Sequence, residues 1–190
     1  MTKKVEFKSG IILLIVGILF FGFQIDQANQ DKEAVFDGYP VPADKNMLFY
    51  IQKSFNTNAV VYTANIGKDG KLNPDEPVKV FWRRYQEDGR IRELKYIEKQ
   101  FAFGVSFKPV KGKENTYVFT LVSLKGMNLY LTLDKHGVPK IATIIAKKPA
   151  SLKRVFVTAE HTKLLPKVFY VEVFGNDLKT GDALYEKIDN

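Results

Sequence analysis

The sequence contains no cysteine, which excludes disulfides, thiolate metal sites and attachment through a lipidated N-terminal cysteine. It has two histidines, His136 and His161, and no H-x-x-x-H or H-E-x-x-H spacing, so we expect neither a metal nor any other cofactor. A G-x-S-x-G elbow, a P-loop and a dinucleotide fingerprint are also missing. These absences favour a protein that is not an enzyme, although they leave open a hydrolase that uses carboxylates, which sequence spacing does not reveal.

The N-terminus carries an apolar segment, residues 9–25, that has no charged residue and follows the basic stretch "MTKKVEFK". This arrangement predicts a signal peptide or a signal-anchor helix over residues 1–25. No small-residue cleavage site follows, which favours an uncleaved anchor in the inner membrane. Because lysines precede the apolar run, we expect the N-terminus in the cytoplasm and the body outside it. The body would lie on the periplasmic side of the membrane or, after cleavage, in the periplasm or the medium.

Lysine and arginine outnumber aspartate and glutamate by 29 to 21, a formal net charge of +8. The charges before residue 32 cancel, so the excess belongs to the rest of the chain. A basic exported body favours an anionic partner, such as a lipid, a glycan, another acidic small molecule or a partner protein. Nucleic acid is not expected, because the cationic residues form no single stripe interleaved with aromatic ones.

Residues 26–46 are polar and include Pro40 and Pro42, which predicts an extended linker or lead-in. Residues 47–190 are predicted to form one β-rich domain, because short runs rich in β-branched and aromatic residues alternate with turn-forming clusters. The runs are MLFYIQKS, AVVYTANI, VKVFWRRY, GVSFKPV, TYVFTLVS, NLYLTLD, PKIATIIA, LKRVFVTAEH and KVFYVEVFG. They predict a mainly β fold, an antiparallel β-sandwich or barrel. In NLYLTLD the three leucines alternate with polar residues and are expected to face the core.

The segment "RELKYIEKQFAFG" differs from these runs. Leu94, Ile97 and Phe101 recur with helical spacing, and Gly104 stands where a helix would end. A strand in this segment would bury polar residues. We therefore predict a single helix over residues 92–103, with those three side chains on its core face.

The stretch "VFWRRY" places two arginines side by side. In a strand, Arg84 shares a face with Trp82 and two valines, whereas Arg83 lies on the opposite face. An inward Arg84 needs a counter-charge, because an unpaired buried charge costs several kcal/mol.

Two interpretations of Arg84 remain open. The first is an internal ion pair with Glu98 or Glu172. The second is an anion-binding cavity in which Arg84, beside Trp82 and with or without Arg154, holds a phosphate or carboxylate. The rarity of unpaired buried charge favours the ion pair.

Two further motifs are weaker. The loop from Asn65 to Glu76 matches part of the calcium-loop template, but Gly67 replaces a ligand and the flanking segments are predicted strands, so a hairpin turn on Asp69 and Gly70 explains the same residues. His161 follows Glu160, and strand alternation would place the two on opposite faces. We expect neither a calcium site nor a catalytic dyad from these residues.

Three blocks of the sequence carry a family resemblance: YPVPADKNMLFYIQKSFNTNAVVYTANI, VFWRRYQEDGRIRELKYIEKQFAFGV and LPKVFYVEVFGNDLKTGDALYEKI. They span residues 38 to 188 and resemble the bacterial exported family termed domain of unknown function forty-eight thirty-three. The resemblance implies an envelope protein and supplies no catalytic residue.

Two functions are therefore expected. The first is a non-catalytic envelope module that binds an anionic lipid, glycan or partner protein. The second is an envelope hydrolase that acts on lipid or glycan. The sequence predicts neither the ligand nor the oligomeric state.

Overall fold

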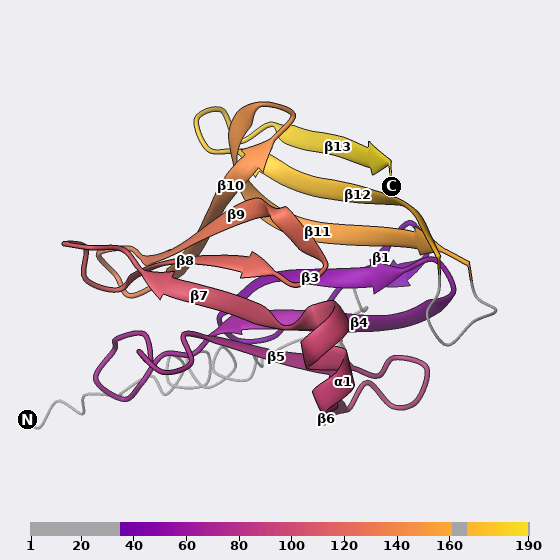
Figure 1. The fold of residues 1–190 in the computed structure, drawn as a ribbon, viewed down its shortest axis with the longest axis horizontal. Helices are drawn as coiled ribbons and strands as arrows, with labels where there is room; N and C mark the ends of the chain where they lie inside the picture. Colours follow the sequence, from indigo (N-terminus) through magenta and orange to yellow (C-terminus); the bar gives the residue numbers. More distant parts are fainter. Residues whose placement is uncertain (1–34, 161–166, 190) are drawn as a thin grey trace, which may run out of the picture. The chain divides into compact units, whose positions relative to one another are not determined.

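The computed structural model describes residues 35–160 and 167–189, which are mainly β (Figure 1). The predicted N-terminal segment and His161 lie outside these residues. No helix in the described ranges is long and apolar enough to cross a membrane. The elements are β1 (Val35–Phe36), β2 (Tyr39–Pro40), β3 (Met47–Lys53), β4 (Asn56–Ala64), β5 (Val78–Arg83), β6 (Ile91–Glu93), α1 (Tyr96–Glu98), the π-helical turn η2 (Lys99–Phe103), β7 (Val105–Pro109), β8 (Thr116–Leu121), β9 (Leu124–Leu133), β10 (Pro139–Ile145), β11 (Lys148–Ala159), β12 (Val168–Asp177) and β13 (Ala183–Asp189).

The main sheet has eleven strands and divides at β11. Its continuous order is β6-β5-β4-β3-β11-β10-β9-β8-β7, and β12 pairs with β11 and β13. Residues 148–150 of β11 pair with β10, whereas residues 154–157 pair with β3. Because β12 pairs along one edge of β11, both β10 and β3 pair along its other edge. The sheet therefore has two wings, β10-β9-β8-β7 and β3-β4-β5-β6, which curl toward each other as a half-barrel (Figure 1).

The mainly β prediction is confirmed, and each of the nine predicted runs contains a strand. The sheet is mixed rather than purely antiparallel, because β3 runs parallel to β11. Leu129 and Leu131 are completely buried, whereas Tyr130 between them is 46% exposed, so the alternation along β9 is as predicted. The C-terminal strand β13 was not predicted, since most of its residues are polar or exposed.

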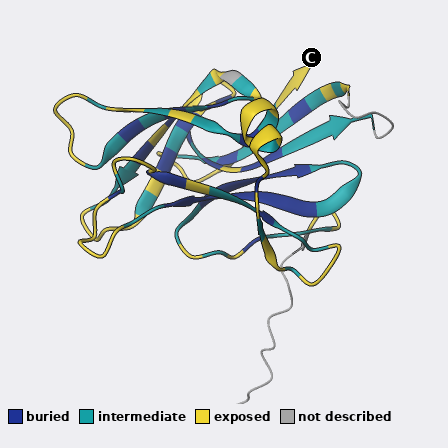
Figure 2. Cartoon of the chain, turned by 60° about the horizontal axis from the view of Figure 1, so that its bottom comes forward, coloured by how far each residue is buried: buried dark blue, intermediate teal, exposed yellow. Residues whose placement is uncertain are grey.

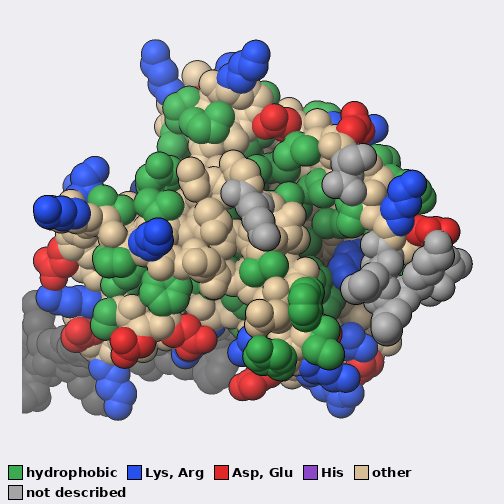
Figure 3. All heavy atoms as spheres, viewed as in Figure 1, with side chains coloured by type: hydrophobic (Ala, Val, Ile, Leu, Met, Phe, Trp, Pro, Cys, Tyr) green, Lys and Arg blue, Asp and Glu red, His purple; other side chains and the backbone are tan. Residues whose placement is uncertain are grey.

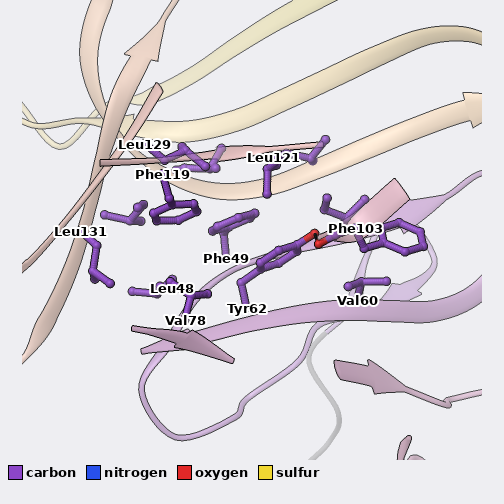
Figure 4. Close-up of a cluster of buried hydrophobic side chains, with 14 of the residues drawn as sticks. Leu48, Phe49, Val60, Tyr62, Val78, Phe103, Phe119, Leu121, Leu129 and Leu131 are labelled. Carbon is purple, nitrogen blue, oxygen red and sulfur yellow. Dashed lines mark hydrogen bonds between the residues drawn. The ribbon is translucent and has the colours of Figure 1, made fainter. Parts of the chain in front are cut away.

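The core lies between the two wings and is rich in aromatic rings (Figure 4). Phe49 of β3 stacks on Tyr62 of β4, with ring centres 4.3 Å apart, and lies 6.4 Å from Phe119 of β8. The buried Tyr62 hydroxyl donates a hydrogen bond of 2.9 Å to the Phe103 carbonyl at the end of η2. This bond ties the helix to the wing formed by β3 and β4.

The helix differs from the prediction in both its start and its buried face. Residues 91–93 form β6, and the helical residues begin at Tyr96. Leu94 is buried as predicted, but Ile97 is 68% and Phe101 69% exposed. The buried side chain of the helical segment is Phe103, which packs edge-on against Trp82 at 5.2 Å between ring centres. Accordingly, Figure 2 shows the helix exposed along most of its length, whereas the buried residues run along the strands.

Gly104 ends the helix for a different reason from the one expected. Its backbone is extended, with φ of −65° and ψ of 161°, rather than left-handed. A Cβ at this position would lie 2.1 Å from the Lys99 carbonyl oxygen. Glycine therefore allows the close approach of the two backbone segments that closes the π-helical turn.

Residues 35–46 pack against the outer face of the sheet. Val41 lies against a small cluster on that face made by Tyr50 and Val61. The β1–β2 hairpin turns at Asp37 and Gly38, both with positive φ, as expected for an Asp-Gly hairpin turn. The part of the expected lead-in that the structure describes is therefore folded with the β domain.

Candidate functional site

An apolar groove opens between the helix and the C-terminal ends of β3 and β11. One part is a cavity of about 330 Å³ beside the helix, and another of about 320 Å³ extends toward β9 and β13. The two cavities adjoin, because both are lined by Ile51, Val157 and Val168. Hydrophobic side chains gather over the helix, and a hollow opens beside them (Figure 3). The groove thus presents an elongated apolar surface.

Lys53, the last residue of β3, brings a cation into this groove. Its Nζ lies 4.7 Å from the ring centre of Phe103 and 5.9 Å from that of Trp82, distances at which a cation is attracted to an aromatic face. Burial lowers the pKa of Lys53, and the charge of Glu98 offsets part of that shift. Within the described ranges, no carboxylate lies at ion-pairing distance from this amine. A partly desolvated, unpaired cation favours the approach of an anion.

Glu98, in the first turn of the helix, already has partners. Its Oε2 accepts a hydrogen bond of 2.7 Å from the Lys95 backbone N–H, and its Oε1 accepts one of 2.8 Å from Nη2 of Arg92. Burial acts to raise the pKa of Glu98, but these hydrogen bonds and the nearby Trp82 indole outweigh it, so the pKa lies below its usual value. The carboxylate is therefore ionised near neutral pH and held by its neighbours.

Within the described part of the chain, two buried N–H donors beside the groove have no partner of hydrogen-bonding geometry, Trp82 Nε1 and Arg92 Nε. The indole N–H lies close enough to Glu98 to help lower that pKa, yet it falls short of a hydrogen bond. The Arg92 guanidinium lies 5.9 Å from the centre of the Trp82 ring. Buried donors without partners are rare in folded proteins and cost free energy. The wall around Lys53 thus has an excess of positive charge and of hydrogen-bond donors.

The structure places the predicted residues of "VFWRRY" in different environments. Trp82 is buried and lines the groove, in the inward row that begins at Val78. Arg84 does not continue that row, because β5 ends at Arg83. Instead Arg84 lies in the following turn and pairs with Glu87 at 2.7 Å.

The counter-charges expected for Arg84 have other partners. Glu98 pairs with Arg92, and Glu172 on β12 accepts a hydrogen bond of 2.9 Å from the Tyr185 hydroxyl. Neither pairs with Arg84, which corrects the expectation of an internal ion pair. The neighbouring Arg83, the last residue of β5, pairs with Asp44, and this pair is more deeply buried than that of Arg84 and Glu87.

Arg154 lies on the opposite side of the sheet from the groove and is only 3% exposed. Its guanidinium carbon is 4.3 Å from the ring centre of Phe36 and 4.7 Å from that of Phe156. Its Nε donates to Gln52 Oε1 at 2.9 Å, and its Nη1 lies 3.6 Å from an Asp37 carboxylate oxygen. Burial lowers the pKa of Arg154, and the charges of Asp37 and nearby tyrosines partly offset this.

These contacts make Arg154 the centre of the packing between the N-terminal hairpin and the sheet. Two of its neighbours, Phe36 and Asp37, belong to the hairpin, and Gln52 also donates a hydrogen bond of 2.7 Å to the Pro40 carbonyl. The expected joint site of Arg84 and Arg154 is therefore not formed, since each arginine is engaged by the chain itself in a separate place.

The loop from Asn65 to Glu76 forms a tight turn that uses its own polar groups. An Ile66–Leu72 bridge closes it, and Gly70 has a positive φ. The side-chain oxygens of Asp69 and Asn73 accept backbone N–H groups of the same loop. In the described ranges, no cluster of three potential metal ligands occurs.

Lys53 and Arg92 were not among the predicted site residues. Lys53 follows five buried residues of β3, but nothing in that pattern shows that the helix from residue 96 approaches the same strand end. Arg92 precedes the helix in a segment expected to be helical, and its real position in β6 sets it beside Trp82.

Comparison with known proteins identifies the family. A family described as "Domain of unknown function (DUF4833)" matches residues 49–187, which include Lys53, Trp82, the helix and most of the residues that line the groove. No curated protein and no solved structure matches the chain. Because the match spans most of the sequence, this chain belongs to the DUF4833 family.

Proposed function

We propose that this protein is a non-catalytic module of the cell envelope that binds an anionic amphiphile in the groove beside the helix. The ligand would have a carboxylate or phosphate head and an apolar chain, as fatty acids and lysophospholipids have. The observation that carries the proposal is Lys53, a half-buried cation at the edge of an apolar cavity that has no ion-pair partner among the residues the structure describes.

The electrostatics of the groove support an anionic head group. Lys53, Arg92 and Glu98 together leave one net positive charge, because Arg92 and Glu98 neutralise each other. A cation that has lost part of its hydration interacts more strongly with an anion than an exposed lysine does. The head group would pair with Lys53.

The lining of the groove supports an apolar chain. Beyond Lys53, six aliphatic side chains of β3, β11 and β12 border the cavities, and Ile188 and Asp189 of β13 border the second one. The cavity beside the helix, about 330 Å³, is within the range of small-molecule sites, roughly 300 to 1,000 Å³. The acyl chain would extend from Lys53 toward Ile51 and Val157.

The alternative of an envelope hydrolase has less support. Two carboxylates border the groove, Asp189 in the second cavity and Glu98 beside the helix, and the pKa of Glu98 is lowered by its hydrogen bonds. A general acid needs a raised pKa near the working pH, and Glu98 already holds Arg92 and the helix N-terminus. Its environment favours a structural role.

The proposed localisation in the cell envelope rests on the sequence, namely the uncharged segment of residues 9–25 and the lysines before it. Fusing a reporter that is active only outside the cytoplasm to the C-terminus of the full chain tests this localisation. Activity of the reporter is expected. A silent reporter, with an active cytoplasmic reporter at the same position, would contradict it.

Photocrosslinking tests the binding site. The full chain is placed in lipid nanodiscs with a fatty acid that carries a diazirine in its chain, irradiated, digested and analysed by mass spectrometry. We expect labelled peptides from β3, β11 and the helix, and loss of labelling when unmodified fatty acid is added in excess. Labelling spread evenly over exposed apolar residues such as Ile144, and insensitive to competition, would refute a specific groove.

A further inference from the structure

The helix exposes a patch of large apolar side chains, called here the tip patch: Tyr96, Ile97 and Phe101. These side chains are 76%, 68% and 69% exposed, respectively. The helix meets the core only near its ends, through Leu94 before it and Phe103 at its close. The apolar stripe that helical spacing would direct to the core therefore faces solvent. Scattered exposed apolar residues are common, but three adjacent ones on a protruding turn indicate a binding surface.

Two lysines flank the tip patch. Both Lys95 and Lys99 are exposed on the helical segment. Arg90 and Arg92, which precede the helix, are paired with Glu87 and Glu98, respectively, so Lys95 and Lys99 are the cations that the tip patch offers to a partner. Figure 3 shows Lys and Arg side chains next to the hydrophobic ones over the helix.

This combination fits a lipid surface better than a protein partner. A stable protein interface buries roughly 800 Å² on each side and depends on complementary shape, whereas the tip patch is a short helical turn that stands out from the strands (Figure 2). Insertion into a bilayer interface needs only exposed apolar and aromatic side chains with cations beside them. The cations would attract anionic headgroups while Ile97 and Phe101 enter the acyl boundary.

We propose that the tip patch docks the β domain on an anionic bilayer surface, separately from any anchoring by the N-terminus. Ile97 and Phe101 also line the cavity beside the helix, so docking would bring the mouth of the groove to the membrane. An amphiphile could then pass between bilayer and groove without crossing water. The docking itself does not depend on the groove holding a ligand.

The absence of cysteine makes a direct test simple, because one introduced cysteine can be labelled without background. Ile97→Cys and Phe101→Cys carry a nitroxide label in the full chain, reconstituted in vesicles of phosphatidylcholine with phosphatidylglycerol or of phosphatidylcholine alone. Ile144→Cys, 56% exposed on β10, is the matched control. Power saturation compares collisions of each label with oxygen and with a water-soluble nickel chelate.

In vesicles with phosphatidylglycerol, we expect the labels at 97 and 101 to favour oxygen over the nickel chelate severalfold more than the label at 144. The preference should fall when Lys95 and Lys99 are both changed to glutamate. Equal, water-like accessibility at 97, 101 and 144 would overturn the proposal. Dipolar broadening between labels at 97 would also overturn it, since it would identify a second copy of the chain as the occupant. If the photoreactive fatty acid fails to label the groove while the nitroxide labels at 97 and 101 still favour oxygen, ligand binding in the groove would be refuted and membrane docking would stand.

Discussion

The ion pair of Arg83 and Asp44 should stabilise the fold much more than that of its neighbour, Arg84. The Arg83 Nε lies 3.1 Å from both Asp44 oxygens, its Nη2 also pairs with this carboxylate, and its Nη1 donates to the Gly89 carbonyl at 2.9 Å. The Asp44 side chain is only 7% exposed and that of Arg83 is 29%. Arg84 pairs instead with Glu87, which Arg90 also contacts.

Arg83→Met would leave the Asp44 carboxylate buried without its partner. Breaking a buried pair costs about 3 to 5 kcal/mol, and the partial exposure of Arg83 reduces this to about 2 to 3 kcal/mol. The Glu87 side chain is 33% exposed, so water can solvate it when Arg84 is replaced, and Arg84→Met should cost about 1 kcal/mol or less. A double-mutant cycle with Asp44→Asn should return most of the larger loss as coupling between the two residues.

Urea unfolding of the full chain in a non-ionic detergent measures these effects through the fluorescence of Trp82, the only tryptophan. With a urea dependence of about 1 to 3 kcal/mol per molar, Arg83→Met should lower the midpoint by about 1 M. Equal small shifts for both arginine variants would refute the assignment of Arg83 to the buried pair.

Three further changes probe the helix and its attachment. Gly104→Ala should destabilise the protein by about 1 to 3 kcal/mol, because its Cβ would meet the Lys99 carbonyl; Gly126→Ala, with open space around its Cβ, should change the urea midpoint little. Tyr62→Phe should cost about 1 to 3 kcal/mol by leaving a helix carbonyl unpaired, and an unchanged midpoint would contradict that bond. The pKa of Glu98 is lowered from 4.5, so the ionised carboxylate contributes fully to the free energy of unfolding above that pH, and this contribution is lost as the pH falls through the folded-state pKa. The protein should therefore be more stable than the Glu98→Gln variant near neutral pH, and the difference should shrink in acid. A difference that does not change with pH would argue against this role of Glu98.

The strands could be predicted because their signal is local. β-Branched and aromatic runs between turn residues were enough to locate nine of the strands, although they missed β13, and alternation placed Trp82, Leu129 and Leu131 correctly. The end of β5 could not be predicted in this way. It depends on Asp44, distant in sequence from Arg83, and on the turn in which the Arg84 N–H bonds to the Arg90 carbonyl.

The helix and the groove depend on contacts that sequence spacing does not show. The Tyr62 hydroxyl fixes the Phe103 carbonyl across 41 residues of sequence, so Phe103, rather than Ile97 or Phe101, enters the core. Lys53 becomes a site candidate only when its strand end, the helix and Trp82 meet. In the same way, Arg154 is enclosed because the N-terminal hairpin folds back onto the sheet.

The most direct test of the groove compares two ligands that differ only in the head group, a long-chain fatty acid and the corresponding primary alcohol. Both compete with the photoreactive acid for the full chain in nanodiscs, with Lys53→Met as the variant and Lys79→Met, an exposed lysine on β5, as the control. We expect Lys53→Met to weaken binding of the acid by about tenfold, equivalent to about 1.4 kcal/mol, and to leave binding of the alcohol nearly unchanged. Lys79→Met should change the binding of neither ligand. An equal effect of Lys53→Met on acid and alcohol, or none on either, would contradict the assignment of Lys53 as the anion-binding residue.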